Sequence, residues 1–241
     1  MSDRFSDPLG DHVQLLTAEQ ERRVSKHPPV DTVYEGFYAS IDPQDQEGAS
    51  YLAGAEGIIG SNLELKQTPD GLVFVAQTDG RNIARPEADA TMRIERALAK
   101  GWTVRCALAL ITYNTANKGF HAEYACFCYD AAAKEACVKA VETFIQNSIQ
   151  RITGGMHPGL ALNQIQFAKV MESGGDWYLT KELPWPELEK GSVFYRRRRT
   201  ATERLIAVAL EHNKGCSTLS WFGLALILVL IGWAVWRAMG F

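Results

Sequence analysis

Two residues near the middle of the chain could carry acid–base chemistry. His121 and Glu123 are two apart in residues 120–129, a run rich in aromatic residues that predicts a β-strand. Residues i and i+2 of a strand share one face, so we expect both side chains on one side, near Thr103 and Arg105 of a partner strand. A histidine beside a carboxylate can exchange protons near neutral pH. The same residues also suit a cross-strand polar cluster, which is the interpretation we favour.

The second candidate for chemistry is His157, in the segment Gly-Gly-Met-His-Pro-Gly at residues 154–159. A flexible connection of this kind could close over a ligand, with the imidazole reaching into the site. The same composition is what a helix end followed by a loop requires, and this simpler interpretation is favoured. If the protein is an enzyme, we expect it to use either His121 with Glu123 or His157.

Cysteine residues form a third candidate group. Cys126 and Cys128 share the apolar face of their strand, Cys106 is expected opposite Cys126, and Cys137 lies in the helix that follows. Four converging thiols could hold a metal ion, but the usual Cys-X-X-Cys spacing is missing, and small buried thiols serve well in a core. We therefore expect core residues, with no metal and no cofactor. The odd number of cysteines, five, indicates reduced thiols.

Standard catalytic signatures are missing from the sequence. It contains no His-Glu-X-X-His, no Gly-X-Ser-X-Gly and no Gly-X-Gly-X-X-Gly. This lowers the weight of an enzymatic function without removing it, and the catalytic residues stay unassigned.

The elements that would position these residues follow a regular order. Three pairs of strand-like runs are each joined by a short turn-forming segment, which predicts three hairpins. The pairs are 62–67 with 72–78, 102–113 with 120–129, and 164–172 with 177–182. Helices are expected between the hairpins, from Pro86 to Gly101 and from Ala131 to about Ile152.

This order predicts an α+β domain, an antiparallel sheet of hairpins with helices packed on one face. A first extended segment is expected at residues 32–41, and residues 42–60 are expected to be a loop or to hold a short helix around Tyr51. After Pro186 we expect a short extended piece reaching Tyr195, and then a helix from Thr200 to Asn213.

The C-terminal residues predict a transmembrane helix at 216–238. No charge occurs from Gly215 to Trp236, and about 21 helical residues at about 1.5 Å each match a hydrocarbon core of about 30 Å. Trp221 and Trp233 suit the two membrane interfaces. A buried core helix is the alternative, but a globular helix of this length normally shows a polar face.

Basic residues before the expected span indicate its orientation. Arg196, Arg197, Arg198 and Arg199 precede the span, and short flanking segments rich in Lys and Arg stay in the cytoplasm. No signal-peptide pattern opens the chain. We therefore expect a single-pass protein of the cytoplasmic (inner) membrane with its N-terminal part in the cytoplasm. The four arginines either bind anionic headgroups at the membrane surface or only set this topology.

Four segments follow from these observations. They are a mobile polar extension at 1–31, a cytoplasmic α+β domain at 32–186, a basic juxtamembrane segment and helix at 187–215, and the transmembrane helix at 216–238. The basic cluster adjoins the span, and no other basic surface is interleaved with aromatic residues, so we expect no nucleic acid partner.

Three hypotheses for function remain, and the first is favoured. It is a tail-anchored, non-enzymatic binding or scaffold module that holds a protein partner or a regulatory ligand at the inner membrane, alone or as a homo-oligomer. The second is a membrane effector whose cytoplasmic sensor domain clusters the spans until the bilayer leaks. The third is a membrane-bound enzyme that uses the histidines named above.

Overall fold

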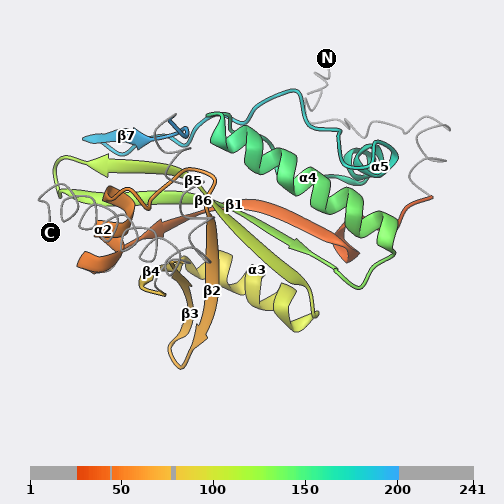
Figure 1. Cartoon of the computed structure of the whole chain (residues 1–241), viewed down its shortest axis with the longest axis horizontal. Helices are drawn as coiled ribbons and strands as arrows, with labels where there is room; N and C mark the ends of the chain where they lie inside the picture. The colour runs from red at the N-terminus through yellow and green to blue at the C-terminus, as the bar shows by residue number, and fades with distance from the viewer. Residues whose placement is uncertain (1–25, 44, 77–79, 201–241) are drawn as a thin grey trace, which may run out of the picture.

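A seven-stranded antiparallel sheet with helices forms the α+β fold of this protein (Figure 1). The computed structural model describes residues 26–43, 45–76 and 80–200. The strands are β1 (Tyr34–Asp42), β2 (Asn62–Thr68), β3 (Gly71–Val75), β4 (Asn82–Pro86), β5 (Thr103–Asn114), β6 (Gly119–Tyr129) and β7 (Ser192–Arg196). The helices are the 3-10 turn η1 (Val30–Thr32), α2 (Gln46–Ala53), α3 (Ala88–Ala99), α4 (Glu135–Thr153) and α5 (Gln164–Glu172). The α+β class predicted from the sequence is therefore confirmed.

Six of the strands close a circuit. The order along the sheet is β2-β3-β4-β1-β6-β5-β7, and β2 also pairs with β5 through Asn62 with Ala107 and Leu63 with Cys106. β7 pairs further along β5, where Thr112 faces Phe194. β2 and β7 therefore share one edge of β5, and the sheet curls around its own core.

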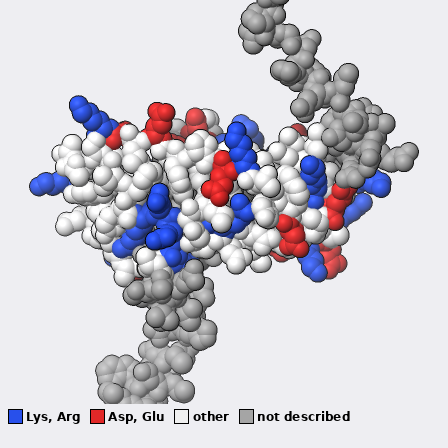
Figure 2. Space-filling model, turned by 90° about the horizontal axis from the view of Figure 1, so that it is seen from above, with Lys and Arg blue, Asp and Glu red and all other residues white. Residues whose placement is uncertain are grey.

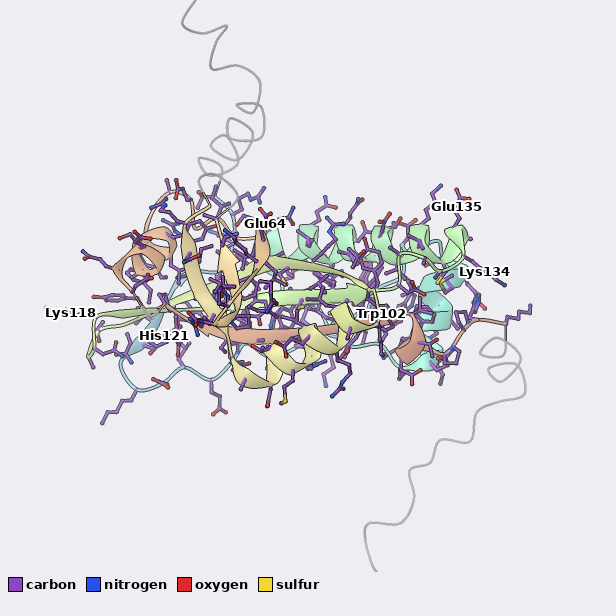
Figure 3. All side chains as sticks on the ribbon, turned by 90° about the horizontal axis from the view of Figure 1, so that it is seen from below. Glu64, Trp102, Lys118, His121, Lys134 and Glu135 are labelled. Carbon is purple, nitrogen blue, oxygen red and sulfur yellow. The ribbon has the colours of Figure 1, made fainter. Side chains whose placement is uncertain are left out.

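The long hairpin of β5 and β6 runs through the middle of the molecule. Its tip, marked by Lys118, lies at one end of the long axis, and the start of α4, marked by Lys134 and Glu135, lies at the other (Figure 3). An irregularity between Leu108 and Leu110 shifts the register by one residue. The core side chains of both strands are almost fully buried, which makes this hairpin the centre of the fold.

The two longer helices lie on opposite faces of the sheet, which corrects the expectation that helices pack on one face. From α3, Arg93 lies over the ring of Phe37, which pairs with Cys126 on the face of the thiols. From α4, Phe144 meets Tyr34 on the other face, at a ring separation of 5.9 Å. Figures 1 and 3 show α3 and α4 on either side of the strands.

A physical signal for this arrangement was present in the sequence. β5 and β6 carry nearly continuous buried runs, Cys106–Ile111 and Tyr124–Tyr129, instead of alternating buried and exposed residues. Continuous apolar runs are typical of strands that are covered on both faces.

The prediction of a third hairpin was wrong. Residues 164–172 form the helix α5, and residues 177–182 form no strand. Asn163 caps α5 reciprocally with Gln166: the Asn163 side chain accepts from the backbone of Gln166, and the Gln166 side chain accepts from the backbone of Asn163. This capping box satisfies two free N–H groups and fixes a helix start that the alternating pattern hid. The predicted turn at 173–176 is present, with Gly174 and Gly175 at positive φ.

The first half of the chain matches the predictions more closely. The hairpin of β2 and β3 turns at Gly71, which has a φ of 114°. The short helix around Tyr51 is α2, which begins where the Asp45 side chain accepts a hydrogen bond from the backbone of Gly48. α4 begins at Glu135 rather than after Asp130, because Asp130 instead closes a turn with Ala132.

The strand β4 was not predicted, and it changes the surroundings of β1. It meets β1 only at Ile41 with Pro86 and Asp42 with Arg85. Pro86, expected to begin a helix, is the last residue of this strand, and α3 follows at once.

The membrane span predicted at 216–238 lies outside the described residues, as do the helix expected at 200–213, except for its first residue, and most of the extension at 1–31. Within the described residues, no helix has both the length and the apolar character to cross a bilayer. β7, which lies in the segment expected to be juxtamembrane, is part of the sheet.

Candidate functional site

His157 and Glu123, which the sequence offered as separate candidates, meet in the structure. β6 directs the Glu123 side chain to the α4 face, and the loop after α4 brings His157 above it. The His157 Nε2 and Glu123 Oε2 atoms are 3.2 Å apart, and the two side chains are 5% and 14% exposed. The imidazole and the carboxylate therefore form a buried ion pair.

The other side of His157 holds a neighbouring segment. Its Nδ1 lies 3.0 Å from the carbonyl oxygen of Pro184, and its backbone carbonyl accepts a hydrogen bond of 2.8 Å from the N–H of Leu183. We call residues 183–186, Leu-Pro-Trp-Pro, the strap. The strap is irregular chain without a neighbouring strand, so His157 supplies hydrogen-bond partners for its backbone groups.

Two aromatic rings enclose the imidazole. The indole of Trp185 lies parallel to it, with ring centroids 4.8 Å apart at an angle of 11°, and the ring of Tyr38 is tilted against it at 4.2 Å. The Tyr38 hydroxyl donates to the carbonyl oxygen of Pro158 at 2.9 Å. β1, the loop after α4 and the strap thus converge on one histidine.

The pKa of His157 reflects two opposed influences. Burial lowers it, while the Glu123 carboxylate, followed by the carbonyls of Pro184 and Leu183, raises it, and the net pKa lies above the ordinary value. Burial, with a smaller effect of the Glu123 charge, also raises the pKa of Tyr38, so its hydroxyl stays protonated. The site therefore favours the charged imidazolium beside the carboxylate.

We call the His157–Glu123 pair the clamp, because His157 holds the strap against the sheet. Its geometry fits this structural role better than that of a proton-transfer catalyst. A general base needs a free lone pair that faces the substrate. In His157, Nδ1 lies 3.0 Å from a carbonyl oxygen, and Nε2 lies 3.2 Å from a carboxylate oxygen in an ion-pair contact, so neither nitrogen is directed at open space. The ring is also covered on two sides by Tyr38 and Trp185.

A cavity of about 470 Å³ opens beside this clamp. Its wall combines the clamp pair with the middle of β1, the loop after α4 and the strap. The residues are Gly36, Phe37, Tyr38, Arg93, Glu123, His157, Leu160, Ala161, Leu183, Pro184 and Pro186. The volume is within the range of small-ligand and side-chain pockets in proteins.

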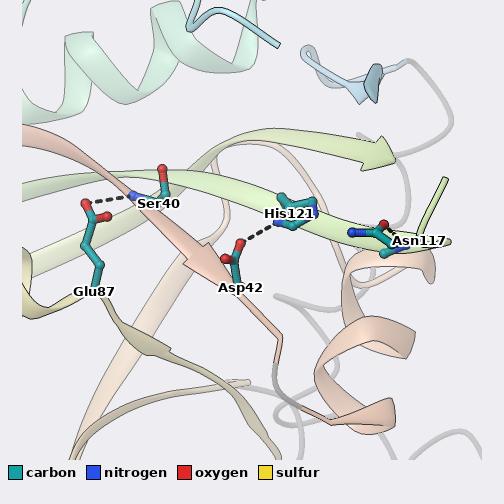
Figure 4. Close-up of polar contacts among 6 residues, drawn as sticks. Ser40, Asp42, Glu87, Asn117 and His121 are labelled. Carbon is teal, nitrogen blue, oxygen red and sulfur yellow. Dashed lines mark hydrogen bonds and ion pairs between the residues drawn. The ribbon is translucent and has the colours of Figure 1, made fainter. Parts of the chain in front are cut away.

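His121 is separate from this cavity. Its Nδ1 contacts the Asp42 carboxylate at 2.5 Å, at the far end of β1 (Figure 4). In the register of β5 and β6 it faces Thr112, and Glu123 faces Leu110, so the expected neighbours Thr103 and Arg105 were wrong. The Asp42 side chain is 69% exposed, and the pair is the kind of surface polar cluster that the sequence favoured.

The four arginines divide into two kinds. Arg196 donates to the backbone carbonyls of Ala53, Gly54 and Gly57, and Arg199 donates to the carbonyl of Ile59. Arg197 and Arg198 are exposed. The quartet lies beside the C-terminal end of α4, where the Arg199 N–H donates to the Thr153 carbonyl. Figure 2 shows a cluster of Lys and Arg side chains on the face of the molecule seen from above.

Three thiols meet in the core, as expected, and the fourth does not join them. Cys106 faces Cys126 with sulfur atoms 3.5 Å apart, and Cys126 and Cys128 are 3.8 Å apart. Cys137 lies on α4, which covers the other face. In the described part of the chain, no three His, Cys, Asp or Glu side chains are placed to hold a metal ion.

Sequence reasoning missed the partners that define the site. Tyr38 lies between two apolar residues of its strand, and Trp185 belongs to none of the predicted elements. One usable signal was the Leu-Pro-Trp-Pro segment itself, because two prolines fix a large aromatic residue in extended chain at little cost in conformational entropy.

Comparisons of the chain with protein-family models, with curated proteins and with solved structures gave no match. The site therefore has to be interpreted from its own geometry.

Proposed function

We propose that this protein is a binding module that holds a partner or a regulatory ligand at the cytoplasmic membrane, with the cavity beside His157 as its binding site. The observation that carries the proposal is this cavity of about 470 Å³, one wall of which is the buried His157–Glu123 pair. Concave sites with a few fixed polar groups are the usual form of ligand sites in proteins.

The design of the wall supports binding over catalysis. The clamp orders the strap, and the strap forms one side of the cavity. Preorganised walls raise affinity because little conformational entropy is lost when the ligand enters. His157 therefore acts by shaping the site and not by transferring protons.

The membrane part of the proposal rests on the sequence. The uncharged run from Gly215 to Trp236 supplies the tether, and Arg197 and Arg198 are exposed cations shortly before it. Exposed basic residues near an anionic leaflet contribute about 1 kcal/mol each. Arg196 and Arg199, which bind backbone carbonyls, contribute to the fold first.

The test uses the tagged full chain expressed in its membrane, with capture after crosslinking. Ala161 is exposed and lines the cavity, so Ala161→Trp should fill the site without disturbing the core. Ala116→Trp, at the exposed tip of the central hairpin, is the matched control. We expect Ala161→Trp to lose the captured partner or ligand and Ala116→Trp to retain it.

Two results would count against the proposal. One is capture by Ala161→Trp equal to that by the unmodified chain, which would place binding elsewhere. The other is recovery of the unmodified chain in the soluble fraction after an alkaline carbonate wash, which would remove the membrane tether.

A further inference from the structure

Arg93 brings unpaired hydrogen-bond donors to the cavity wall. Its Nε donates to the Glu35 Oε1 at 2.7 Å, and its guanidinium carbon lies 3.6 Å from the centroid of the Phe37 ring. These two contacts fix the position and the plane of the guanidinium. Its terminal nitrogens, Nη1 and Nη2, have no hydrogen-bond partner among the described residues. Arg93 and Phe37 both line the cavity, so these free N–H groups belong to its wall.

The open edge of β1 adds backbone donors to the same wall. The backbone N–H of Ser40 points away from β6 and donates to the Glu87 Oε1 at 3.3 Å (Figure 4). Because backbone direction alternates along a strand, the N–H groups of Gly36 and Tyr38 point outward in the same way. β4 pairs only with the C-terminal end of β1, and no backbone group of the described residues pairs with these two on that side. Both residues line the cavity.

The two carboxylates near these donors already have partners. Glu123 pairs with His157 at 3.2 Å, and Glu35 accepts from the Arg93 Nε. With His157 protonated, each carboxylate faces one cation, so the free hydrogen-bonding groups decide which ligand fits. The outward carbonyls of β1 are matched one for one by its outward N–H groups, whereas the Nη groups of Arg93 have no matching acceptor. The wall therefore has an excess of donors, which an anion satisfies.

The remaining lining of the cavity is apolar. The loop after α4 contributes the buried Leu160 and the exposed Ala161, and the strap contributes Leu183, Pro184 and Pro186. A volume of about 470 Å³ admits a small organic molecule or the end of a peptide chain. A ligand that fills this space therefore combines an apolar body with an anionic group.

Building on the proposed function, we propose that the cavity binds a carboxylate with an apolar body, and that the Arg93 guanidinium holds the carboxylate. The planar guanidinium presents N–H groups in the fork that matches the two oxygens of a carboxylate. The apolar body packs against the strap and Leu160. A single guanidinium in a wall that also holds Glu123 suits one negative charge better than a phosphate, which carries nearly two. The carboxylate belongs either to a free acid or to the C-terminal residue of a protein, because the recognising chemistry is the same.

The first test compares head groups on the full chain in nanodiscs. The probes are a panel of linear, branched and aromatic carboxylic acids, each paired with its primary amide, which keeps the shape and removes the charge. Ligand-observed NMR measures binding, and empty nanodiscs correct for partition into the lipid. We expect at least one acid to bind at least tenfold more tightly than its amide, and Ala161→Trp to abolish this binding.

A second arm of the same test separates the two sources of the carboxylate. It uses tetrapeptides that end in an apolar residue, each with a free or an amidated C-terminus. Tenfold preference for acids of the first panel supports a small-molecule ligand. The same preference for the free terminus, seen in the tetrapeptides alone, supports the end of a partner chain.

The second test uses Arg93→Gln, with Arg85→Gln as the matched control. Arg85 is exposed, pairs with Asp70 at 3.5 Å and does not line the cavity. Arg93→Gln should reduce the preference for the acid over its amide to less than twofold and change the affinity for the amide less than twofold. Arg85→Gln should keep the full preference. The comparison of head groups needs no variant of the protein, so it stays decisive if Arg93→Gln unfolds.

Three outcomes overturn this inference: equal binding of acids and amides in both arms or no binding of either, an acid preference that persists in Arg93→Gln, or acid binding to Ala161→Trp as strong as to the unmodified chain. If Ala161→Trp abolishes crosslinked capture but no carboxylate binds, the ligand class is wrong and the binding function stands. If crosslinked capture is insensitive to Ala161→Trp, the binding function itself fails.

Discussion

The indole of Trp185 lies parallel to the imidazole of His157, with ring centroids 4.8 Å apart. Trp185 also meets Phe194 of β7 at 6.1 Å, edge to face. The strap therefore connects the cavity wall to the strand that precedes the exposed arginines.

The stability of the protein should depend on pH through His157. Its folded pKa lies above the unfolded value of about 6.5. Its stabilisation is therefore complete below the unfolded pKa and is lost as the pH rises through the folded pKa. Glu123→Gln should lower the free energy of unfolding by about 3 kcal/mol near pH 6, because breaking a buried pair is costly, and by less at pH 9. Denaturant unfolding at the two pH values measures this.

The same variant should invert the pKa shift of His157. The groups around the ring are Glu123 of β6, Tyr38 of β1 and the carbonyls of the strap, with Arg151 of α4 acting on Tyr38. Without the carboxylate, burial should dominate and bring the pKa below its ordinary value, as an NMR titration of the imidazole protons would show. Asp42→Asn, which removes an exposed partner of His121, should leave His157 unchanged. A raised His157 pKa in Glu123→Gln would contradict the assignment.

Loss of the stacked indole should loosen the strap. Trp185→Ala removes the ring over His157, and an aromatic pair of this kind contributes about 1 kcal/mol beyond its buried area. We expect faster hydrogen exchange at the Leu183 amide, which donates to the His157 carbonyl. Trp185→Phe, which keeps a ring in place, is the matched control and should exchange at an intermediate rate. Unchanged exchange in Trp185→Ala would show that the strap is held without the stack.

The first two hairpins and the α+β class could be predicted from sequence because each depends on local patterns. Gly71 and the apolar alternation define the first hairpin, and Gly101 ends α3 at a φ of 76°. The capping box of Asn163 and Gln166 is also a local signal, and it outweighs the alternating pattern that predicted a strand there.

The binding site could not be predicted in this way, because its parts meet only in the folded chain. Glu123 and His157 come from a strand and a loop, and the contact depends on how α4 lies across the sheet. A histidine in a sequence indicates a capacity for proton transfer, but the role of His157 depends on the atoms that its two ring nitrogens contact. No local signal in the sequence carries that information.

Arg196 should matter for stability, and Arg197 with Arg198 should matter for membrane contact. Arg196 donates to three carbonyls at the end of α2, and hydrogen bonds of a charged donor contribute about 2 kcal/mol. Arg196→Ala should lower the thermal midpoint, and the exposed pair changed to Ala should not. The pair should instead weaken cosedimentation of a chain lacking 216–241 with anionic vesicles, by about 1 kcal/mol per residue. Equal vesicle binding by the double variant would assign the arginines to topology alone.

Gly36 should tolerate no side chain. A Cβ atom there would lie 2.6 Å from the Leu160 carbonyl oxygen, and it would also clash with the Tyr34 hydroxyl, which donates to that same carbonyl. Gly36→Ala should therefore destabilise the fold by about 1–3 kcal/mol through overpacking, and it should move the loop that lines the cavity. Chemical denaturation measures the first effect, and crosslinked capture of the partner or ligand measures the second. An alanine variant as stable as the unmodified chain would mean that this loop has room to shift.

The thiols of the core should be inert in the folded protein. Burial raises the pKa of Cys126, and the hydrogen bond shared with Cys126, followed by burial, raises the pKa of Cys128. The thiolate is the reactive form of cysteine. A Cys216→Ser variant, which keeps four thiols, should therefore react slowly with a chromogenic disulfide reagent at pH 8. All four thiols should react only in denaturant. The rate should follow global unfolding for Cys106, Cys126 and Cys128, because all three are almost fully buried in the central hairpin. Fast labelling of any of these three under native conditions would mean that the face under α3 opens locally, without global unfolding of the sheet.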